Sequence, residues 1–473
     1  MRALKERAVP ETAYRGHKAV VVGLGRQGMA MARFLLRCGA HVVGTDVRPA
    51  DALAAQVAEL RALGGEVVAG GHPLSLLEGA ALVGVSGGVP LTIPLLQEAQ
   101  RRGVPLVSDA ALTLRHATGP VLAITGSAGK TTTTTLVGQM LEASGIPVRV
   151  GGNIGVPALE WVLEMAPHEW LVLELSSFQL ELCTESPHVA AVLNVTPNHL
   201  DRHPSMEAYA EAKRNIFRYQ QPGDVVVLGW DNPWTRRWWE EAVPQGVRRL
   251  AFSLREPVPE GAYLQGDGVC LRREGREYRV CRVDEIRLRG RHNVANVLAA
   301  IVLASVAGAS VDAMREVIRT FSGVPHRLEE VRRWRGALWV NDSIATAPER
   351  VVAALNSFTE PIVLLAGGRD KKLSWEAFAR VAAARARWVI AFGEAAPLIV
   401  EVLRPYVGNG SLEKVEQVTD LEAAVLRAAA VVREGDVVLL SPGGTSFDAY
   451  ANFEERGNHF RQLVWALDGE ATS

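Results

Sequence analysis

The stretch VLAITGSAGKTTTTTLVGQMLEASG at residues 121–145 decides the fold of the central part of the chain. A short apolar run predicts a buried strand, the glycine loop GSAGKT follows it, and a helical stretch comes next. Such loops surround phosphates with backbone amides, while the lysine contacts β and γ oxygens and the threonine holds magnesium. Ile124 stands where the first glycine of the longer GxxxxGK[ST] pattern would be, so a purely structural glycine turn is the alternative. We predict that ATP binds to Gly126, Ser127, Ala128, Gly129, Lys130, Thr131 and Thr132.

A second strand–glycine–helix unit lies near the N-terminus. The apolar run 19–22 precedes Gly23, Gly25 and Gly28 in GxGxxG spacing, and Asp46 ends the next strand. This pattern is typical of dinucleotide sites, yet its physics suits any diphosphate at a helix N-terminus, a UDP group included. A nicotinamide-dependent oxidoreductase is therefore an alternative, although it would leave GSAGKT without a role.

Short apolar strands, each followed by a polar or glycine loop and a helix, begin again after residue 323. Polar, glycine and proline segments near residues 112 and 323 mark domain boundaries. The predicted fold class is α/β with three domains: a Rossmann-like domain over 1–112, a central P-loop-type ATPase domain over 113–323, and a Rossmann-like domain over 324–473.

Composition excludes several classes of protein. The 473 residues carry a formal net charge of −1 and are 48% hydrophobic and 22% charged, which fits a globular multidomain protein and gives no basic field for nucleic acid. The start of the chain lacks the apolar segment of a signal peptide, and no apolar run is long enough to span a bilayer. We therefore expect a cytoplasmic protein without membrane insertion. The four cysteines have no metal-ligand spacing and are expected to be buried, reduced thiols.

Lysine is rare in this chain, at seven of the 51 basic residues. Positions that remain lysine are candidates for chemistry that a guanidinium cannot do, such as point-charge contact or reaction of a neutral amine. Lys130, Lys213 and Lys371 are three of them. Taken alone, Lys213 would be a surface helix lysine, His199 a loop histidine, and Lys371 a solvated loop charge.

TGSAGKT at 125–131 resembles the shortened phosphate loop TGTNGK[ST] of the Mur ligase family, and further motifs follow in family order over nearly the whole chain. They are GGNIG at 151–155, LELSSFQL at 173–180, NVTPNHLDRH at 194–203, AEAKRNIF at 210–217, GRHNVANVLAA at 290–300, PHRLE at 325–329, NDSIAT at 341–346, GGRDKK at 367–372 and SPGGTSFDAYANFEERG at 441–457. ELSSFQL and SPGGTSFD are most similar to the branch of the family that adds D-glutamate.

The resemblance implies an ATP-dependent amide-bond-forming ligase that joins D-glutamate to UDP-N-acetylmuramoyl-L-alanine through an acyl phosphate, in cytoplasmic peptidoglycan precursor synthesis. ATP, two Mg²⁺ ions and a carbamylated Lys213 are the implied cofactors, and a monomer is expected. The implied metal ligands are Thr131, Glu174, His199 and Lys213, and the implied catalytic residues are Lys130, Glu174, His199 and Lys213. A structural ion pair is the alternative role for Glu174.

The same resemblance assigns a binding role to each domain: UDP-substrate to the first, ATP to the second and the amino acid to the third. Closure of the third domain over the nucleotide is then expected during turnover. Further ATP contacts would be His292, Asn293, Asn296, Arg327 and Asp342. UDP-substrate contacts would be Leu24, Asp46, Arg48, Ser86, Gly87, Asn153 and His199. Amino-acid contacts would be Thr346, Lys371, Ser446, Phe447 and Phe453.

Four positions depart from the family pattern: Ala128 replaces Asn, Gly87 replaces Pro, Asn198 replaces Asp and Ile344 replaces Lys. Ile344 matters most, because that lysine adds positive charge near the transferring phosphate. The alternatives left open are a sibling Mur ligase, a folylpolyglutamate synthase-like ligase with another acceptor, and a catalytically impaired paralogue.

Overall fold

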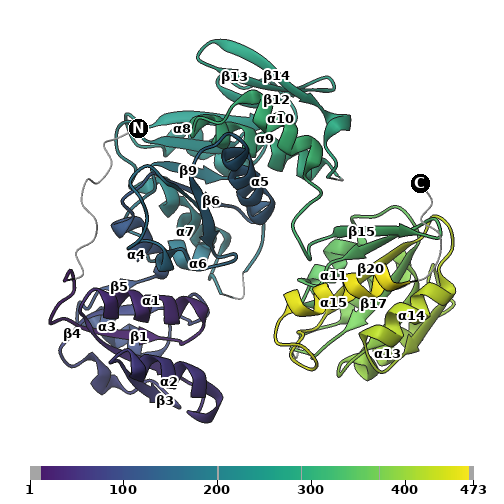
Figure 1. Ribbon diagram of the computed structural model, residues 1–473, viewed down its shortest axis with the longest axis horizontal. Coiled ribbons are helices and arrows are strands. Elements are labelled where there is room, and N and C mark those ends of the chain that lie inside the picture. Colours follow the sequence, from purple (N-terminus) through teal and green to yellow (C-terminus); the bar gives the residue numbers. More distant parts are fainter. Residues whose placement is uncertain (1–11, 200–201, 289, 372, 468–473) are drawn as a thin grey trace. The chain divides into compact units, whose positions relative to one another are not determined.

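The computed structural model describes residues 12–199, 202–288, 290–371 and 373–467 (Figure 1). The chain divides into two compact units, Met1–Phe321 and Ser322–Ser473. The described residues form three separate sheets, two in the first unit and one in the second. The prediction of three α/β domains is confirmed, and the boundaries at residues 112 and 323 stay predictions.

The first sheet is parallel, in the order β3-β2-β1-β4-β5. Gly28 is required in its GxGxxG turn, because a Cβ at that position would lie 1.8 Å from the carbonyl oxygen of Gly23. The strands are β1 Lys18–Val22, β2 His41–Asp46, β3 Glu66–Ala69, β4 Ala80–Val85 and β5 Leu106–Val107, and the helices are α1 Arg26–Arg37, α2 Ala54–Ala62, α3 Pro94–Arg101 and α4 Asp109–His116.

The second sheet has the order β14-β13-β12-β11-β10-β9-β6-β8-β7. Its strands are parallel except that β13 is antiparallel to both of its neighbours, β12 and β14. Its strands are β6 Val121–Thr125, β7 Val148–Gly152, β8 Trp170–Glu174, β9 Val189–Val192, β10 Val225–Gly229, β11 Arg248–Ser253, β12 Gly261–Gln265, β13 Gly268–Arg273 and β14 Arg276–Arg282. Its helices are α5 Lys130–Ala143, α6 Ser177–Leu180, α7 Met206–Arg218, α8 Pro233–Glu241, α9 Arg291–Val306 and α10 Val311–Thr320.

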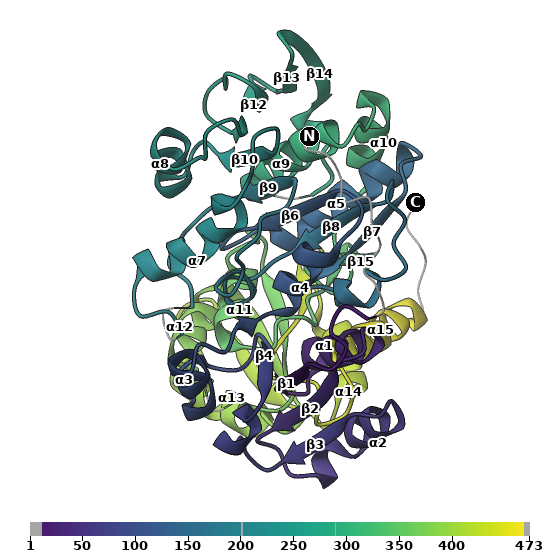
Figure 2. The same ribbon diagram turned by 90° about the vertical axis from the view of Figure 1, so that its left-hand side faces the viewer.

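Strand β6 lies inside this sheet, between β8 and β9, and α5 follows it and packs beside it (Figure 1, Figure 2). The carboxyl ends of parallel strands meet at one edge of a sheet, so the loops after β6, β8 and β9 come together. The tryptophans of α8 pack: Trp238 is buried against Phe217, and Trp234 contacts Trp238.

The third sheet, in the second unit, has the order β15-β16-β20-β17-β18-β19 and is parallel except for β15. Neighbouring residues of a strand face opposite cores, because side chains alternate along it: Leu364 packs in one apolar cluster and Leu365 in the other. The strands are β15 Glu329–Trp334, β16 Ala337–Asn341, β17 Ile362–Gly367, β18 Ala386–Phe392, β19 Lys414–Gln417 and β20 Val437–Gly443. The helices are α11 Pro348–Leu355, α12 Glu376–Arg385, α13 Ala396–Leu403, α14 Leu421–Val431 and α15 Phe453–Ala466.

All four cysteines are buried and free, which confirms the prediction of reduced thiols. Within the described ranges, the helices are too short or too polar to cross a membrane.

Candidate active site

The phosphate loop leaves β6 at the edge of the second sheet and enters α5. Gly129 has φ +85°, and a Cβ there would lie 2.1 Å from the side-chain oxygen of Asn296, so this position needs glycine. Asn194, after β9, receives the backbone N–H of Ala128 at 2.9 Å and donates to its carbonyl at 3.1 Å. The asparagine that the family loop carries at position 128 is absent, yet the loop is held from the neighbouring strand.

Lys130 begins helix α5, and its Nζ donates to the Gly126 carbonyl at 2.9 Å. Ser127 joins the same loop to helix α7, because its Oγ lies 3.0 Å from the Tyr209 hydroxyl and donates to Thr196 O at 3.0 Å. The loop is therefore braced by two groups that sequence reasoning missed, Asn194 and Tyr209. Asn194 begins the motif at 194–203, and Tyr209 directly precedes the motif at 210–217. Neither side chain is charged, so the sequence offers no reason to expect more than a packing role for either of them.

Glu174 ends β8 and is only 2% exposed. Its Oε2 accepts a hydrogen bond from the Thr131 hydroxyl at 2.7 Å, and its Oε1 accepts one from the Asn153 side chain at 3.0 Å. The structure thus joins a predicted metal carboxylate to the phosphate loop and to a predicted substrate residue. Neutral donors satisfy both oxygens, so an ion pair is not needed to explain the burial of Glu174.

Thr131 and Glu174 offer a hydroxyl and a carboxylate, the hard oxygen donors that Mg²⁺ prefers. Among the described residues, no group of three or more His, Cys, Asp or Glu side chains could hold a metal ion. Mg²⁺ in nucleotide sites usually takes one or two protein ligands and fills the remainder with waters and phosphates. The pair therefore fits a nucleotide-bound Mg²⁺ and does not fit a fully protein-ligated ion.

Lys213 on α7 is 1% exposed, so its reading as a surface lysine is wrong. Its Nζ donates to the Gly126 carbonyl at 3.0 Å and to the Thr125 hydroxyl at 3.3 Å, and lies 4.6 Å from the centre of the Tyr209 ring. Burial, helped by nearby Lys130, lowers the pKa of Lys213 well below its usual range. The two lysines share one carbonyl at the phosphate loop.

His199 is exposed and has φ +55°. Its ring meets the edge of Phe178 with 5.2 Å between ring centres, and it lies 6.4 Å from the ring of Tyr209, the residue that Lys213 also contacts. His203, which sequence reasoning did not single out, is buried and stacks parallel to the Phe178 ring with 5.3 Å between ring centres. His199 and Lys213 are thus neighbours of a shared tyrosine, and their roles as metal ligands stay predictions.

The first domain carries the predicted UDP-substrate residues. Asp46 accepts hydrogen bonds from the Leu24 backbone at 2.8 Å and from the Arg48 guanidinium at 2.8 and 3.0 Å. The Arg48 hydrogen bonds hold the pKa of Asp46 well below its usual range, so the carboxylate stays ionised. Leu24, Asp46 and Arg48 are therefore brought together, and their role in binding the UDP-substrate stays a prediction.

A cavity of about 200 Å³ lies where the GLGRQG turn faces the loop after β7. It contains two predicted residues, Ser86 and Asn153, and Gly87 borders it through a hydrogen bond of 3.2 Å from its N–H to Gln27 Oε1. Arg26 and Gln27 line the same cavity and were missed. Both occupy variable positions of GxGxxG, a pattern that carries no expectation for those side chains.

Asn296 on α9 packs against the phosphate loop at Gly129 and donates to the Asn293 side chain at 3.0 Å. This places two of the three predicted adenine and ribose contacts beside the loop. His292 lies at the exposed start of the same helix, next to Gly290.

In the second unit, Asp342 is 5% exposed and follows β16. Its carboxylate accepts from the Ser441 hydroxyl at 2.8 Å and from the Leu328 N–H at 3.2 Å. Burial raises the pKa of Asp342 to about 7, and nearby Arg327 opposes that shift. Arg327 and Asp342, the two residues of this unit that are predicted to contact ATP, therefore lie close to each other.

The predicted amino-acid residues divide into two groups. Lys371 Nζ donates to the Thr346 hydroxyl at 3.1 Å, so these two lie together. Ser446 is buried, whereas Phe447 is 61% exposed and Phe453 packs its ring edge against His326 with 6.2 Å between ring centres. The roles of these residues in binding the amino acid stay predictions.

Arg456 is a further residue that sequence reasoning missed, although it lies inside the last quoted motif. It is fully buried and donates to the Ser343 hydroxyl at 3.1 Å and to the carbonyls of Gly444 and Thr445 at 3.3 and 3.1 Å. Burial lowers its pKa to about 10. It joins the NDSIAT and SPGGTS loops.

With its three α/β domains, a phosphate loop, a buried carboxylate beside that loop and an adjoining cavity, the chain fits the class of enzymes that use a nucleoside triphosphate. Family models match it as a MurD-like N-terminal domain at residues 17–108, a Mur ligase middle domain at 124–304, and a Mur ligase glutamate ligase domain at 326–444. The chain belongs to the Mur ligase family, whose members are ATP-dependent amide-bond-forming ligases.

Among its relatives is the UDP-N-acetylmuramoylalanine–D-glutamate ligase of Symbiobacterium thermophilum, 45% identical over 95% of this chain and 98% of that protein. The ligase of the same name from Pelotomaculum thermopropionicum is 40% identical over the same shares. A solved UDP-N-acetylmuramate–alanine ligase from Thermotoga maritima aligns with a TM-score of 0.56 and 21% identity, over 95% of this chain and 99% of that one. At that identity the structure supports the fold alone.

Proposed function

We propose that this chain joins D-glutamate to UDP-N-acetylmuramoyl-L-alanine with ATP, through an acyl phosphate, as a cytoplasmic step of peptidoglycan precursor synthesis. The observation that carries the proposal is Glu174, which binds Thr131 of the phosphate loop with one oxygen and Asn153 of the substrate cavity with the other. One carboxylate therefore joins the proposed nucleotide site to the proposed UDP-substrate site. The D-glutamate ligases that are 36–45% identical over nearly the full chain support the choice of substrates.

The proposed chemistry transfers the γ-phosphoryl group of ATP to a substrate carboxylate, and the amine of the amino acid then displaces phosphate from the acyl phosphate. Backbone amides of the phosphate loop and the Lys130 ammonium would hold the phosphates, so positioning and charge neutralisation do most of the work. Thr131 and Glu174 would hold Mg²⁺, which neutralises phosphate charge when it is bound. Lys371 and Thr346 would donate to a carboxylate of D-glutamate.

Lys213 is proposed to carry a carbamate that helps, with His199, to hold a second Mg²⁺. Burial supports this: within the described chain its Nζ meets a carbonyl, a hydroxyl and an aromatic face. A neutral primary amine can take up carbon dioxide, and the resulting carbamate offers hard anionic oxygens. A monomer without nucleic-acid partners remains our expectation.

D-glutamate should stimulate phosphate release from ATP in the presence of UDP-N-acetylmuramoyl-L-alanine, and the other acceptors should not. The measurement compares D-glutamate with L-lysine, diaminopimelate and D-alanyl-D-alanine at equal concentrations. Discrimination should be at least about 10²-fold, because a site built to pair two carboxylates at the spacing of D-glutamate leaves polar groups unpaired with a ligand that has one carboxylate or, as in diaminopimelate, two that are farther apart. Equal stimulation by another acceptor would point to a sibling ligase.

Ile344→Lys should leave kcat at least equal to that of the parent. Its backbone N–H donates to His326 O at 3.1 Å and its carbonyl accepts from Arg350 at 3.3 Å, so the backbone is held independently of the side chain. An added ammonium would relieve a deficit of positive charge near the transferring phosphate. The check is steady-state phosphate release, with Ile344→Met as the uncharged control. A tenfold or greater loss with unchanged thermal stability would mean that the site is built around an apolar residue.

A further inference from the structure

The loop that carries Arg327 has an unusual backbone. His326 and Leu328, on either side of Arg327, have φ of +64° and +44°. Residues with side chains rarely adopt the left-handed region, and such conformations persist only when their surroundings hold them. Contacts with the surrounding residues must therefore stabilise the backbone of this loop.

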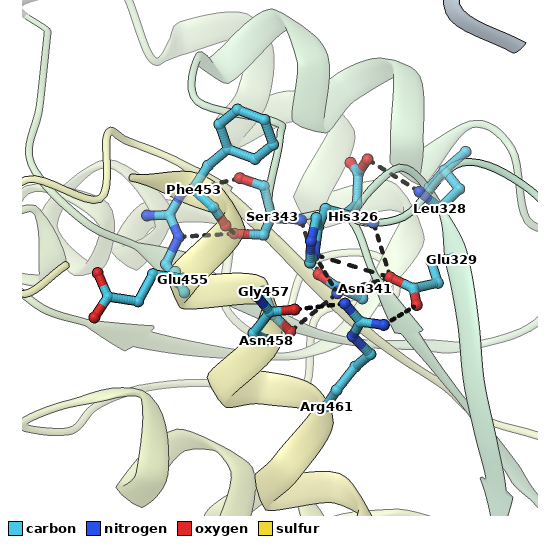
Figure 3. A network of polar contacts seen from close by, with 12 residues as sticks. His326, Leu328, Glu329, Asn341, Ser343, Phe453, Glu455, Gly457, Asn458 and Arg461 are labelled. Atoms are coloured by element: carbon cyan, nitrogen blue, oxygen red, sulfur yellow. Dashed lines mark hydrogen bonds and ion pairs between the residues drawn. The ribbon is translucent and has the colours of Figure 1, made fainter. Parts of the chain in front are cut away.

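Asn341, the last residue of β16, is the centre of these contacts (Figure 3). It is fully buried, and its Nδ2 lies 3.0 Å from His326 Nδ1, 3.0 Å from Glu329 Oε2 and 3.1 Å from Gly457 O. Its Oδ1 accepts from the Ser343 N–H at 3.1 Å. A carboxylate and a carbonyl face the NH₂ group, and an N–H faces the oxygen, so an amide is the side chain that suits this position.

Glu329 holds the loop from its other side. Its Oε2 accepts the backbone N–H of His326 at 2.8 Å, and its Oε1 lies 3.3 Å from Arg461 Nη1 on α15 (Figure 3). Gly457 on the same helix leaves room for the imidazole, since a Cβ there would lie 2.2 Å from His326 Nδ1. Helix α15 thus contributes the guanidinium of Arg461, which pairs with Glu329, and a glycine that lets the His326 ring pack against the helix.

The loop is also tied to the segment that follows β16. His326 O accepts from the Ile344 N–H at 3.1 Å, and the Leu328 N–H donates to Asp342 Oδ1 at 3.2 Å. Arg327 therefore stands between two residues whose backbones are fixed, beside the carboxylate with which it is expected to bind ATP.

We propose that Asn341, Glu329 and Arg461 are positioning residues that fix Arg327 for nucleotide binding. They act through the backbone of His326 and Leu328. This inference rests on the proposed function and on the expected contact of Arg327 with ATP.

Asn341→Asp tests the inference, because it keeps the shape but places a carboxylate against Glu329 and the Gly457 carbonyl. KM for ATP should rise about tenfold or more, and kcat should change less than about threefold. KM for UDP-N-acetylmuramoyl-L-alanine, which the first unit binds, should stay within about twofold. An unchanged KM for ATP in a folded variant would overturn the inference.

A combined variant separates positioning from general stability. Arg327→Ala alone should raise KM for ATP, and adding Asn341→Asp should raise it little further, because the loop then has no guanidinium to position. If the increase in KM for ATP in the combined variant were the product of the increases in the two single variants, Asn341 would act independently of Arg327. That result would overturn the proposal. An unchanged KM for ATP in Arg327→Ala would instead remove the ATP role of Arg327 and the positioning proposal, while the ligase activity of the parent would still support the proposed function.

Glu329→Gln is a second variant for the case in which Asn341→Asp does not fold. It keeps an acceptor for His326 but loses the charge that pairs with Arg461, so a rise of about threefold in KM for ATP is expected. Glu330→Gln is its matched control, since Glu330 is exposed on the same strand and pairs in register with Val340. Equal KM values for the two glutamine variants would count against a positioning role for Glu329.

Discussion

Lys130→Ala is expected to reduce ATP-dependent phosphate release by at least about 10²–10³-fold, because one preorganised cation would be lost where charge develops on the transferring phosphoryl group. Its Nζ rests on the Gly126 carbonyl at 2.9 Å, at the mouth of the loop. The affinity for the UDP-substrate should change less than about threefold, since Lys130 is not among the residues that line the cavity with Arg26 and Ser86.

Two measurements check this result: phosphate release, and UDP-substrate affinity by calorimetry without ATP. Lys18→Ala is the matched control, because Lys18 Nζ makes an exposed contact with Glu78 O at 2.8 Å in the first sheet. It should behave like the parent in both assays. If Lys130→Ala lost UDP-substrate binding together with turnover, the phosphate loop and the UDP-substrate cavity would not be separate binding sites.

Lys213→Arg is expected to be nearly as damaging as Lys213→Ala, with a loss of about 10²-fold or more in kcat. Arginine preserves charge and approximate length, but a guanidinium does not form a carbamate. A protonated lysine would repel Mg²⁺, whereas a carbamate turns the same position into an anionic ligand. Small carboxylates should partly restore Lys213→Ala by occupying the vacated ligand position.

Because Lys213 is buried, arginine could also fail by crowding, and a second readout separates the two causes. Labelled bicarbonate should give a carbamate carbon signal in the parent and none in Lys213→Ala. Lys414→Arg, at an exposed lysine that pairs with Glu416, is the matched control and should change neither the activity nor the carbamate signal. Near-parental activity in Lys213→Arg, or a missing carbamate signal, would disprove the role.

The class of fold could be predicted because each βα unit repeats a local pattern. The apolar run 121–125, the loop GSAGKT and the helix that begins at Lys130 occur in the structure as β6, the phosphate loop and α5. Alternation of apolar residues and the conformational demands of glycine act over a few residues, so sequence alone reports them.

The partners of the site residues were beyond such local rules. Lys213 contacts Gly126 from 87 positions away, and Asn194 binds Ala128 from 66 positions away. The side chain of Asn341 meets Glu329, His326 and Gly457, which are 12, 15 and 116 positions away. Arg456 shows the same point, since an arginine in a polar motif reads as exposed until the fold surrounds it with carbonyls.

By itself, then, the sequence determined the order of the α/β units, the phosphate loop and the residues that resemble a Mur ligase. The tertiary structure alone decided which of these residues touch, because contacts and burial depend on which loops meet at the edge of a sheet. It is there that Glu174 binds both Thr131 and Asn153, and that two left-handed residues fix Arg327 between them.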